Sequence, residues 1–439
     1  MLLDERMTVD PTAARTHTED LAAFVVASPT PYHAVAEAAR RLTAAGFSEL
    51  DETATWELSA GGYFIIRDGS LVAWRIPAGA TAGTGYRIVG SHTDTPTFKL
   101  KPRPDIRTAD GWQQLGVEIY GGPLLNTWMD RDLGLAGRLV IADGDRSDPG
   151  SIKTVLVKTG AIMRIPELAP HLDRSVNEAL KLDRQQHTAP IWGVSRPDRS
   201  ILDHLAELAG ADRDQLLGFD VTAYDTASPA IIGLDGEFFA SGRLDNLSSV
   251  HASLAALEQA DPGDHIPVLA AFDHEEAGSA TPSGAAGPIL ESVLERISSA
   301  LGAAGQDHLR ALAASICLSS DTGHAVNPNY PGHHDPQHRP VLNGGPLLKV
   351  NAVQRYATDA VGTAVWRLAC AAAGVPTQEF VSNNAVPCGS TIGPITATRI
   401  GITTVDVGAP LLGMHSAREL AGVQDLYALS RVMRAFLAA

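Results

Sequence analysis

Apolar and polar positions alternate along the chain in a way that predicts an α/β protein. The stretch "HIPVLAAF" at 265–272 is short, apolar and bounded by Gly263 and Gly278, which is typical of a buried strand. From about Glu237 onward, such runs alternate with segments of helical pattern. The strand-like runs are "PVLAAFDH", "ASICLSSD", "LLKVN", "EFVSNN" and "ITTVDVG", and the helical segments are "TDAVGTAVWRLACAAAG" and a closing helix, "ARELAGVQDLYALSRVMRAFLAA". This alternation predicts a mostly parallel sheet flanked by helices.

The N-terminal part carries sharper local signals. Thr30 and Pro31 supply a capping residue and a first-turn proline, and Gly46 ends the helical segment "YHAVAEAARRLTAAG". Asp68-Gly69 separates two alternating runs in "GYFIIRDGSLVAWRI" and predicts a β-hairpin. A third strand follows in "GYRIVGSHTDTP". These elements supply the first strands of the predicted sheet.

The pattern changes between residues 95 and 235. This region has Pro and Gly breaks, strand-like runs such as "TVLVKTGAI", and a charged, loop-like segment near "LKLDRQQHTAPIWG". We therefore expect a discontinuous α/β domain formed by residues 1–94 and 236–439. An inserted, largely β domain at 95–235 interrupts it.

Composition and charge argue against several classes of protein. The 439 residues are 44% hydrophobic and 19% charged, as in an ordinary folded protein of two or three domains. The formal net charge of −16 would repel nucleic acid and anionic membranes. No stretch reaches the ~18 apolar residues of a membrane span, and the glycine spacing does not match a nucleotide fingerprint. We expect no nucleic acid partner, no membrane partner and no nucleotide cofactor.

The three cysteines, Cys317, Cys370 and Cys388, are odd in number and form no CxxC pair. Neither a disulfide framework nor a structural zinc site of the usual spacing is predicted. Together with the polar N-terminus, "MLLDERMTVDPTAARTHTED", this favours a reducing, cytoplasmic location.

Polar side chains gather where the predicted strands end, which is where chemistry collects in α/β sheets. They are His92 and Asp94 in "VGSHTDT", Asp245 in "SGRLDNLSS", Glu275 and Glu276 in "AAFDHEEAGSATPSG", Asp321 in "CLSSDTGHAVNPNY", and His415 in "LGMHSARE". Imidazoles and carboxylates form a donor set suited to zinc, and less exclusively to manganese or cobalt. A set of this size fits two metal ions better than one.

Each candidate also has a plain structural interpretation. A single His after a strand is more often a hydrogen-bonded structural residue than a ligand. Asp245 could cap a helix beginning at "DNLSSVHASLAALEQA", and Asp321 could form an Asx-turn. His333, His334 and His338 in "YPGHHDPQHRP" could bind stray metal but fit a solvated loop better. Each of these interpretations is plausible for one strand-end residue by itself. They are implausible for the whole set, because several independent strand ends would each carry an unpaired side chain of a metal-ligand type.

Eight longer motifs occur in order from about Ser28 to the C-terminus. They are "SPTPYHAV", "GSHTDTPTFKLKP", "RLDNLSS", "DHEEAGS", "SDTGHAVNPNY", "GGPLLKVNAVQRYAT", "CGSTIGPI" and "GMHSARE". Their sequences and order resemble the aspartyl aminopeptidase family of di-zinc metallopeptidases, over nearly the whole chain. The resemblance implies a zinc-peptidase fold, an inserted oligomerisation domain, and hydrolysis of the N-terminal peptide bond after an acidic residue, Asp or Glu.

The resemblance also implies how the strand-end residues divide between two zinc ions. One zinc takes His92 and Asp321 as terminal ligands, the other takes Glu276 and His415, and the Asp245 carboxylate bridges the two. Manganese or cobalt would be possible substitutes.

Two residues are implied to act beside the metals. Glu275 takes the proton of the attacking water as general base. Asp94 is placed to accept the other ring N–H of His92, and its loss should weaken zinc or slow turnover by ~10- to 100-fold. A cis Asp245-Asn246 peptide, which aims the bridging carboxylate at both metals, is a further implication.

The substrate-binding positions are implied by resemblance as well. They are His324, Lys349, Tyr356 and, from the inserted domain, His171 in "LAPHLDR". Lys349 supplies a point charge and Tyr356 a hydroxyl for a side-chain carboxylate. Alternatively, Lys349 ends a strand with its ammonium in water, and His171 lies on a surface helix. Because the −16 charge does not attract anionic peptides at long range, any acidic preference must arise at contact distance.

One departure from the family pattern bears on the pocket. Thr322-Gly323 stands where relatives often carry bulkier residues, so the pocket near the metals could differ in size from that of the family.

In the resembling family twelve subunits form a tetrahedral shell, and the inserted domain of one subunit reaches into the active site of its neighbour. The segment "LKLDRQQHTAP" is a candidate interface loop, although its composition equally fits a flexible loop.

Two other functions stay open. One is a co-catalytic zinc aminopeptidase or deacylase of broader specificity. The other is a non-catalytic oligomeric scaffold or cargo shell, against which the intact Glu275 argues.

Overall fold

The computed structural model describes residues 9–144, 148, 150–195 and 199–439. By their internal contacts the residues divide into two units. The first comprises Met1–Asp94, Pro229–Met414 and Glu419–Ala439, and the second comprises Thr95–Ser228 and His415–Arg418. The first unit resumes at Pro229, before the expected position 236, because β11 (Ala230–Ile232) pairs with β12 (Phe238–Ser241).

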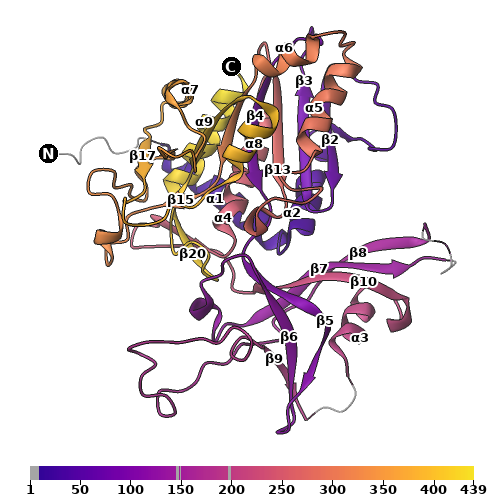
Figure 1. Ribbon diagram of the computed structural model, residues 1–439, viewed down its shortest axis with the longest axis vertical. Helices are drawn as coiled ribbons and strands as arrows, with labels where there is room; N and C mark the ends of the chain where they lie inside the picture. The colour runs from indigo at the N-terminus through magenta and orange to yellow at the C-terminus, as the bar shows by residue number, and fades with distance from the viewer. Residues whose placement is uncertain (1–8, 145–147, 149, 196–198) are drawn as a thin grey trace. The chain divides into compact units, whose positions relative to one another are not determined.

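A nine-stranded sheet forms the centre of the first unit (Figure 1). In spatial order it contains β1 (Phe47–Glu49), β2 (Gly61–Arg67), β3 (Ser70–Ile76), β13 (Ile266–Phe272), β4 (Tyr86–His92), β14 (Ile316–Ser320), β18 (Thr403–Gly408), β16 (Leu347–Val350) and β17 (Gln378–Val381). The central strands β13, β4, β14 and β18 run parallel to one another, as do β1 with β2 and β16 with β17. The remaining pairings are antiparallel. The predicted mostly parallel sheet is confirmed.

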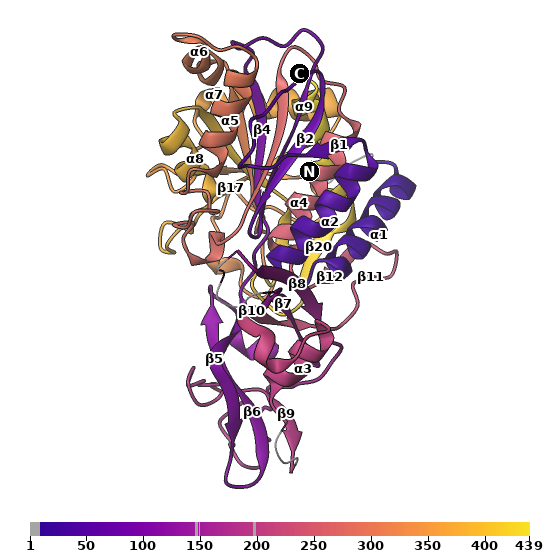
Figure 2. The same cartoon turned by 90° about the vertical axis from the view of Figure 1, so that its right-hand side faces the viewer.

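Helices cover both faces of this sheet (Figure 2). They are α1 (Pro11–Ala27), α2 (Pro31–Ala44), α4 (Leu244–Gln259), α5 (Ile289–Ala300), α6 (Asp307–Ala313), α7 (Ala360–Ala373), α8 (Ile392–Ile400) and α9 (Val423–Leu437). Alternate strand residues enter two separate cores, because successive side chains of a strand point to opposite faces. Val89 packs in the core with α1, α2, α4, α7 and α9, and its neighbour Ile88 packs in the core with α5 and α8.

The local signals near the N-terminus are confirmed. Helix α2 begins at Pro31 with the Thr30 side chain as its cap, and Gly46 follows it with a φ of 85°. Strands β2 and β3 pair with Arg67 opposite Ser70, so Asp68-Gly69 forms a two-residue hairpin turn.

The closing helix is shorter than predicted. Residues Glu419–Gly422 form β20, and α9 begins only at Val423. Strand β20 pairs with β12 and β19 (Pro410–Leu412) in a small second sheet, completed by β11 and β15 (Gly323–His324). These distant partners override the helical composition of "ARELAGVQ", since strand formation depends on non-local pairing.

The second unit is built on a six-stranded sheet. Its order is β8 (Ile152–Lys158), β7 (Leu133–Ala142), β10 (Leu216–Asp225), β5 (Thr97–Arg107), β6 (Trp112–Tyr120) and β9 (Ile191–Val194), with α3 (Ile201–Leu208) packed in its core. All the pairings are antiparallel, so the inserted region is largely β, as predicted. The segment "LKLDRQQHTAP" is a loop, whereas the following "IWG" belongs to β9.

Among the described helices, none has an apolar stretch long enough to cross a lipid bilayer.

Candidate functional site

Three parallel strands bring candidate residues to one edge of the large sheet. Strand β4 ends at His92, whose register partner on β13 is Phe272, and β14 ends just before Asp321. After Phe272 the chain turns sharply through His274, which has a φ of 65°, into a single 3-10 turn that begins at Glu275. The carboxyl ends of parallel strands meet at one edge, so these side chains converge.

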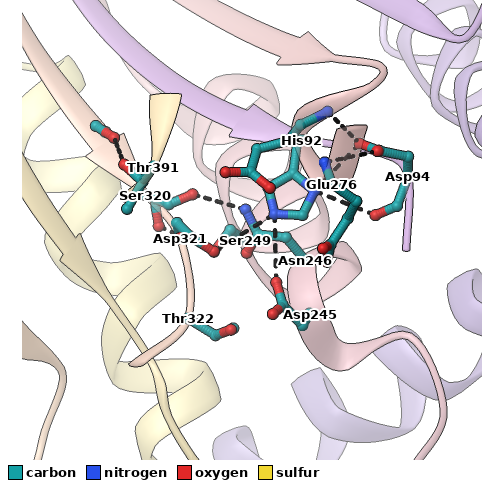
Figure 3. Close-up of polar contacts among 12 residues, drawn as sticks. His92, Asp94, Asp245, Asn246, Ser249, Glu276, Ser320, Asp321, Thr322 and Thr391 are labelled. Atoms are coloured by element: carbon teal, nitrogen blue, oxygen red, sulfur yellow. Dashed lines mark hydrogen bonds and ion pairs between the residues drawn. The ribbon is translucent and has the colours of Figure 1, made fainter. Parts of the chain in front are cut away.

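The imidazole of His92 lies among buried carboxylates. Its Nε2 atom is 3.3 Å from Asp245 Oδ1 and 3.4 Å from Asp321 Oδ1. All three side chains are nearly inaccessible to solvent, and Figure 3 shows His92 contacting both carboxylates. One ligand atom from each residue lies within 4.8 Å of the others.

The paired glutamates join the same cluster. His92, Glu275 and Glu276 also each offer a ligand atom within 4.8 Å of the others. Burial raises the pKa of the Glu275 carboxyl to about 7; the nearby His92 opposes this rise and the charges of Asp321, Asp94 and Asp245 reinforce it.

Asp94 holds the glutamates more directly than it holds His92. Its Oδ1 accepts a hydrogen bond from the Glu275 N–H and its Oδ2 one from the Glu276 N–H, each at 3.0 Å. The Nδ1 atom of His92 is 3.1 Å from the main-chain oxygen of Asp94 and 3.4 Å from its Oδ1. Asp94 therefore orients the imidazole chiefly through its main chain and the two glutamates through its side chain. Figure 3 shows Asp94 beside His92 and Glu276.

The start of helix α4 shapes the position of Asp245. The Asp245-Asn246 peptide is cis, as predicted. Arg243 stands at the N-cap position of α4 and no side chain caps this end, so Asp245 is not the cap; it lies two residues later, at a kink where φ and ψ are non-helical. Its neighbour Asn246 donates from Nδ2 to the main-chain oxygen of Ser320 at 2.8 Å, next to Asp321.

One supporting residue was missed by sequence reasoning. The buried Glu419 accepts a hydrogen bond at Oε2 from the Asp245 N–H at 3.1 Å. The residue belongs to the motif "GMHSARE", but the pattern of "ARELAGVQ" predicts a helix there. Its place in β20 could not be inferred from local pattern alone.

The donor set of the cluster fits a divalent cation. Four carboxylates, from Asp245, Asp321, Glu275 and Glu276, lie around the imidazole of His92 at a partly buried edge. Burial lowers the pKa of His92, but Asp245, Asp321 and Asp94 outweigh it and raise that pKa well above the usual value. Buried like charges repel each other unless a cation balances them. Oxygen and imidazole ligands match zinc, manganese or cobalt.

Lys349 is buried, so its ammonium does not lie in water as one interpretation held. Its Nζ donates to Asp321 Oδ2 at 3.2 Å and to the Thr322 main-chain oxygen at 2.8 Å. Nζ also lies 5.3 Å from the centre of the Tyr356 ring. A cation and a phenol therefore stand next to Asp321.

The rings of Tyr356 and His324 both pack against the ring of Phe380. The Tyr356 ring centre lies 6.3 Å, and the His324 ring centre 5.8 Å, from that of Phe380, both in edge-on geometry. Burial, followed by the adjacent Cys388 thiol, raises the pKa of the Tyr356 phenol. His324 itself is exposed, so it stands at the solvent side of this group.

The close packing at Gly323 accounts for part of the difference from the family pattern at Thr322-Gly323. A Cβ atom at this position would lie 2.5 Å from Leu347 Cδ1. The glycine therefore lets Leu347 approach closely, and Leu347 in turn packs with Tyr356 and Phe380. A bulkier residue at 323 would have to displace Leu347 within this apolar group.

Two predicted residues belong to the second unit. His171 lies exposed in the loop before β9, outside any helix, so the surface-helix alternative is wrong. His415 has a φ of 64°, and its Nδ1 lies 3.0 Å from the main-chain oxygen of Gly122 within the same unit.

The histidine-rich loop has local hydrogen bonds. His334 Nε2 accepts from the Asn327 N–H at 3.1 Å, and His338 Nδ1 lies 2.9 Å from Asp335 Oδ1. Within the described ranges these histidines join no group of converging ligand atoms, which favours the loop interpretation.

Known proteins resemble this chain over almost its full length. A family profile described as "Aminopeptidase I zinc metalloprotease (M18)" matches residues 24–437. A Streptomyces coelicolor protein named "Probable M18 family aminopeptidase 2" is 53% identical over 431 residues, covering 96% of this chain and 98% of the relative.

Solved structures are similar as well. The structure titled "Cryo-EM structure of the Ape4 and Nbr1 complex" matches with a TM-score of 0.93 and 34% identity, over 99% of this chain and 87% of that one. The S. cerevisiae mApe1 dodecamer matches with a TM-score of 0.84 and 31% identity, over 95% of both chains.

Proposed function

This chain belongs to the aminopeptidase I (M18) family of zinc metalloproteases, and we propose that it removes N-terminal Asp or Glu from peptides by means of two zinc ions and Glu275. Family membership makes it a metallo-aminopeptidase. The observation that carries the finer proposal is the convergence of His92, Asp245, Asp321, Glu275 and Glu276 at the strand ends.

The residues divide between the two metals as follows. His92 and Asp321 would hold one zinc, Glu276 and His415 would hold the other, and the Asp245 carboxylate would serve both. When bound, a zinc pair lowers the pKa of a shared water and polarises the scissile carbonyl. Manganese or cobalt could replace zinc in this donor set.

Glu275 is the proton carrier of the reaction. Its carboxylate takes a proton from the attacking water as the water oxygen bonds to the carbonyl carbon. The same proton then passes to the departing amine nitrogen as the carbon–nitrogen bond breaks. Asp94 accepts a hydrogen bond from the main-chain N–H of Glu275, and this bond keeps the Glu275 residue next to the other cluster residues.

Acidic specificity comes from Lys349 and Tyr356, with His324 at the solvent side. Lys349 is a buried cation, and buried charges interact far more strongly than exposed ones. A local cation of this kind can favour an acidic side chain although the chain as a whole carries a net charge of −16.

The assembly follows the dodecamer described for mApe1. In this proposal His171, from the inserted region of a neighbouring subunit, completes the substrate site. The inserted region is then an oligomerisation domain, and the enzyme acts in the cytoplasm.

A substrate series tests the proposed specificity. We expect kcat/KM for N-terminal Asp and Glu substrates to exceed that for Ala and Leu by roughly 10- to 100-fold, the effect of one hydrogen bond between charged groups. The measurement is steady-state hydrolysis of matched peptides by zinc-reconstituted oligomer. Equal rates for all four would indicate a broad-specificity aminopeptidase, selective cleavage of N-acyl substrates a deacylase, and no turnover a scaffold.

The contacts of Asp94 predict the effect of Asp94→Asn. An amide nitrogen would replace one of the two oxygens that accept from the Glu275 and Glu276 N–H groups. We expect kcat/KM to fall by roughly 10- to 100-fold with the protein still folded. Circular dichroism and metal analysis accompany the kinetics. The exposed Asp264→Asn serves as control, and an Asp94 variant as active as this control would contradict the proposed role.

A further inference from the structure

A fully buried carboxylate beside the candidate metal centre has no part in the chemistry above. Asp406 lies on β18, the strand next to β14, whose end carries Asp321. A charge is costly to bury unless hydrogen bonds or opposite charges compensate it. The groups that surround Asp406 therefore indicate what it does.

The side chain of Asp406 ties two loops to the sheet. Its Oδ2 accepts a hydrogen bond from the Ala357 N–H at 2.5 Å, and its Oδ1 accepts one from Thr391 Oγ1 at 2.7 Å. Its own N–H donates to Thr358 Oγ1 at 2.9 Å. Ser319, its register partner on β14, lies 3.2 Å from the Thr391 hydroxyl. One carboxylate thus holds the segments 355–358 and 388–391.

These two segments carry neighbouring side chains of the proposed substrate site. Tyr356 directly precedes Ala357, and its phenol contacts the Cys388 thiol. The segments are also joined to each other, because Ser390 Oγ donates to the Arg355 main-chain oxygen at 3.3 Å. If the Asp406 side chain moved, the two segments that it holds would move with it, and the position of the Tyr356 ring would change.

Helix α8 is packed closely onto the same carboxylate. Thr391 caps α8 by accepting from the Gly393 N–H at 3.0 Å. A Cβ atom at Gly393 would lie only 2.3 Å from Asp406 Oδ1, so the first turn of the helix requires glycine here. The positive end of the helix dipole then faces the carboxylate.

We propose that Asp406 is a positioning residue that fixes Tyr356 next to Lys349, and so sets the affinity for the acidic side chain of the substrate. The inference rests on the proposed aminopeptidase function and deepens it. Asp406 does not touch substrate or metal in this proposal. It acts through the Ala357 N–H and the Thr391 hydroxyl.

Asp406→Asn is the main test. In asparagine an NH2 group, which donates rather than accepts, replaces one of the two oxygens that accept from Ala357 and Thr391, so one loop should loosen. We expect KM for an N-terminal Asp substrate to rise about 10-fold, the effect of one lost hydrogen bond to a charged group. We expect kcat to stay within about 3-fold and zinc content to match wild type, because the change acts on substrate binding rather than on the chemical step.

Thiol labelling gives a readout that does not depend on the substrate. Cys388 is half-buried, whereas Cys317 and Cys370 are buried. We expect Asp406→Asn to speed the reaction of Cys388 with DTNB several-fold, since the Tyr356 contact loosens. Cys388→Ser identifies this phase in both backgrounds. If wild type shows no acidic preference, the proposed function fails, and the labelling rates still test the positioning role.

Variants at Thr404 and Thr391 serve as the control and as the second test. Thr404→Val removes a buried hydroxyl from the same strand. This hydroxyl donates to the main-chain oxygen of Ile402, so its loss should leave KM and labelling unchanged. If Asp406→Asn does not fold, Thr391→Val should shift both readouts in the same direction and Thr391→Ser should restore them. Wild-type KM and labelling in a folded Asp406 or Thr391→Val variant would overturn the proposal. So would a fall in kcat with loss of zinc.

Discussion

Replacing Glu275 with Gln should lower kcat/KM by roughly 100- to 10,000-fold, the usual contribution of a positioned general base. The amide is close in size to the carboxylate but cannot take up the proton of water. The main-chain N–H of residue 275 still donates to Asp94 Oδ1, so the 3-10 turn and the neighbouring proposed ligand Glu276 should keep their positions. The measurement is steady-state cleavage of an N-terminal Asp peptide together with metal analysis.

The metal content separates a base from a ligand at this position. Glu275→Gln should retain zinc as wild type does, and the exposed Glu295→Gln on α5 should keep full activity. A Glu275 variant that loses zinc would make Glu275 a ligand. A variant that keeps most of its activity would remove it from the mechanism.

Replacing Asp245 with Ala should abolish activity and weaken the binding of both proposed metal ions by at least about 100-fold, the upper end of the effect of supporting residues. A bridging carboxylate contacts both ions, so its loss should affect both. The change also removes one negative charge from the crowded cluster around His92. In the absence of metal, the variant should therefore be as stable as wild type or more so.

Thermal unfolding with and without zinc measures both the stability of the variant and its binding of metal. Wild type should rise in Tm as zinc is added, because a ligand that binds only the folded state stabilises it. Asp245→Ala should show little or no rise, whereas the exposed Asp261→Ala should behave as wild type. An Asp245 variant that retains zinc and its full Tm rise would exclude the bridging role.

The sequence predicted the fold and grouped the candidate residues because both depend on regular features. Strands of a parallel sheet end at one edge, so His92, Asp321 and the Glu275-Glu276 pair could be grouped from their positions after apolar runs. Asp245 was grouped with them from its position as well, and the motif resemblance added its cis peptide, which no periodicity reveals.

The supporting contacts could not be predicted, because each joins segments that are far apart in the chain. Asp406 lies in the strand-like run "ITTVDVG", but its partners Ala357 and Thr391 come from loops that have no regular pattern. Glu419 was hidden in a helix-like segment whose strand character comes from β12 and β19. The buried position of Lys349 likewise depends on its ion pair with Asp321, which sequence spacing does not show.

The wide separation of His92, Asp245 and Asp321 along the chain determines when this centre can form. In an unfolded chain, bringing these residues together would require closing long loops, at an entropic cost that grows with loop length. The order of events follows: β4, β13 and β14 must assemble first, and a cation can bind tightly only to the sheet edge they create. On this argument metal uptake follows the assembly of these strands, and the free energy of metal binding adds to the stability of the folded chain.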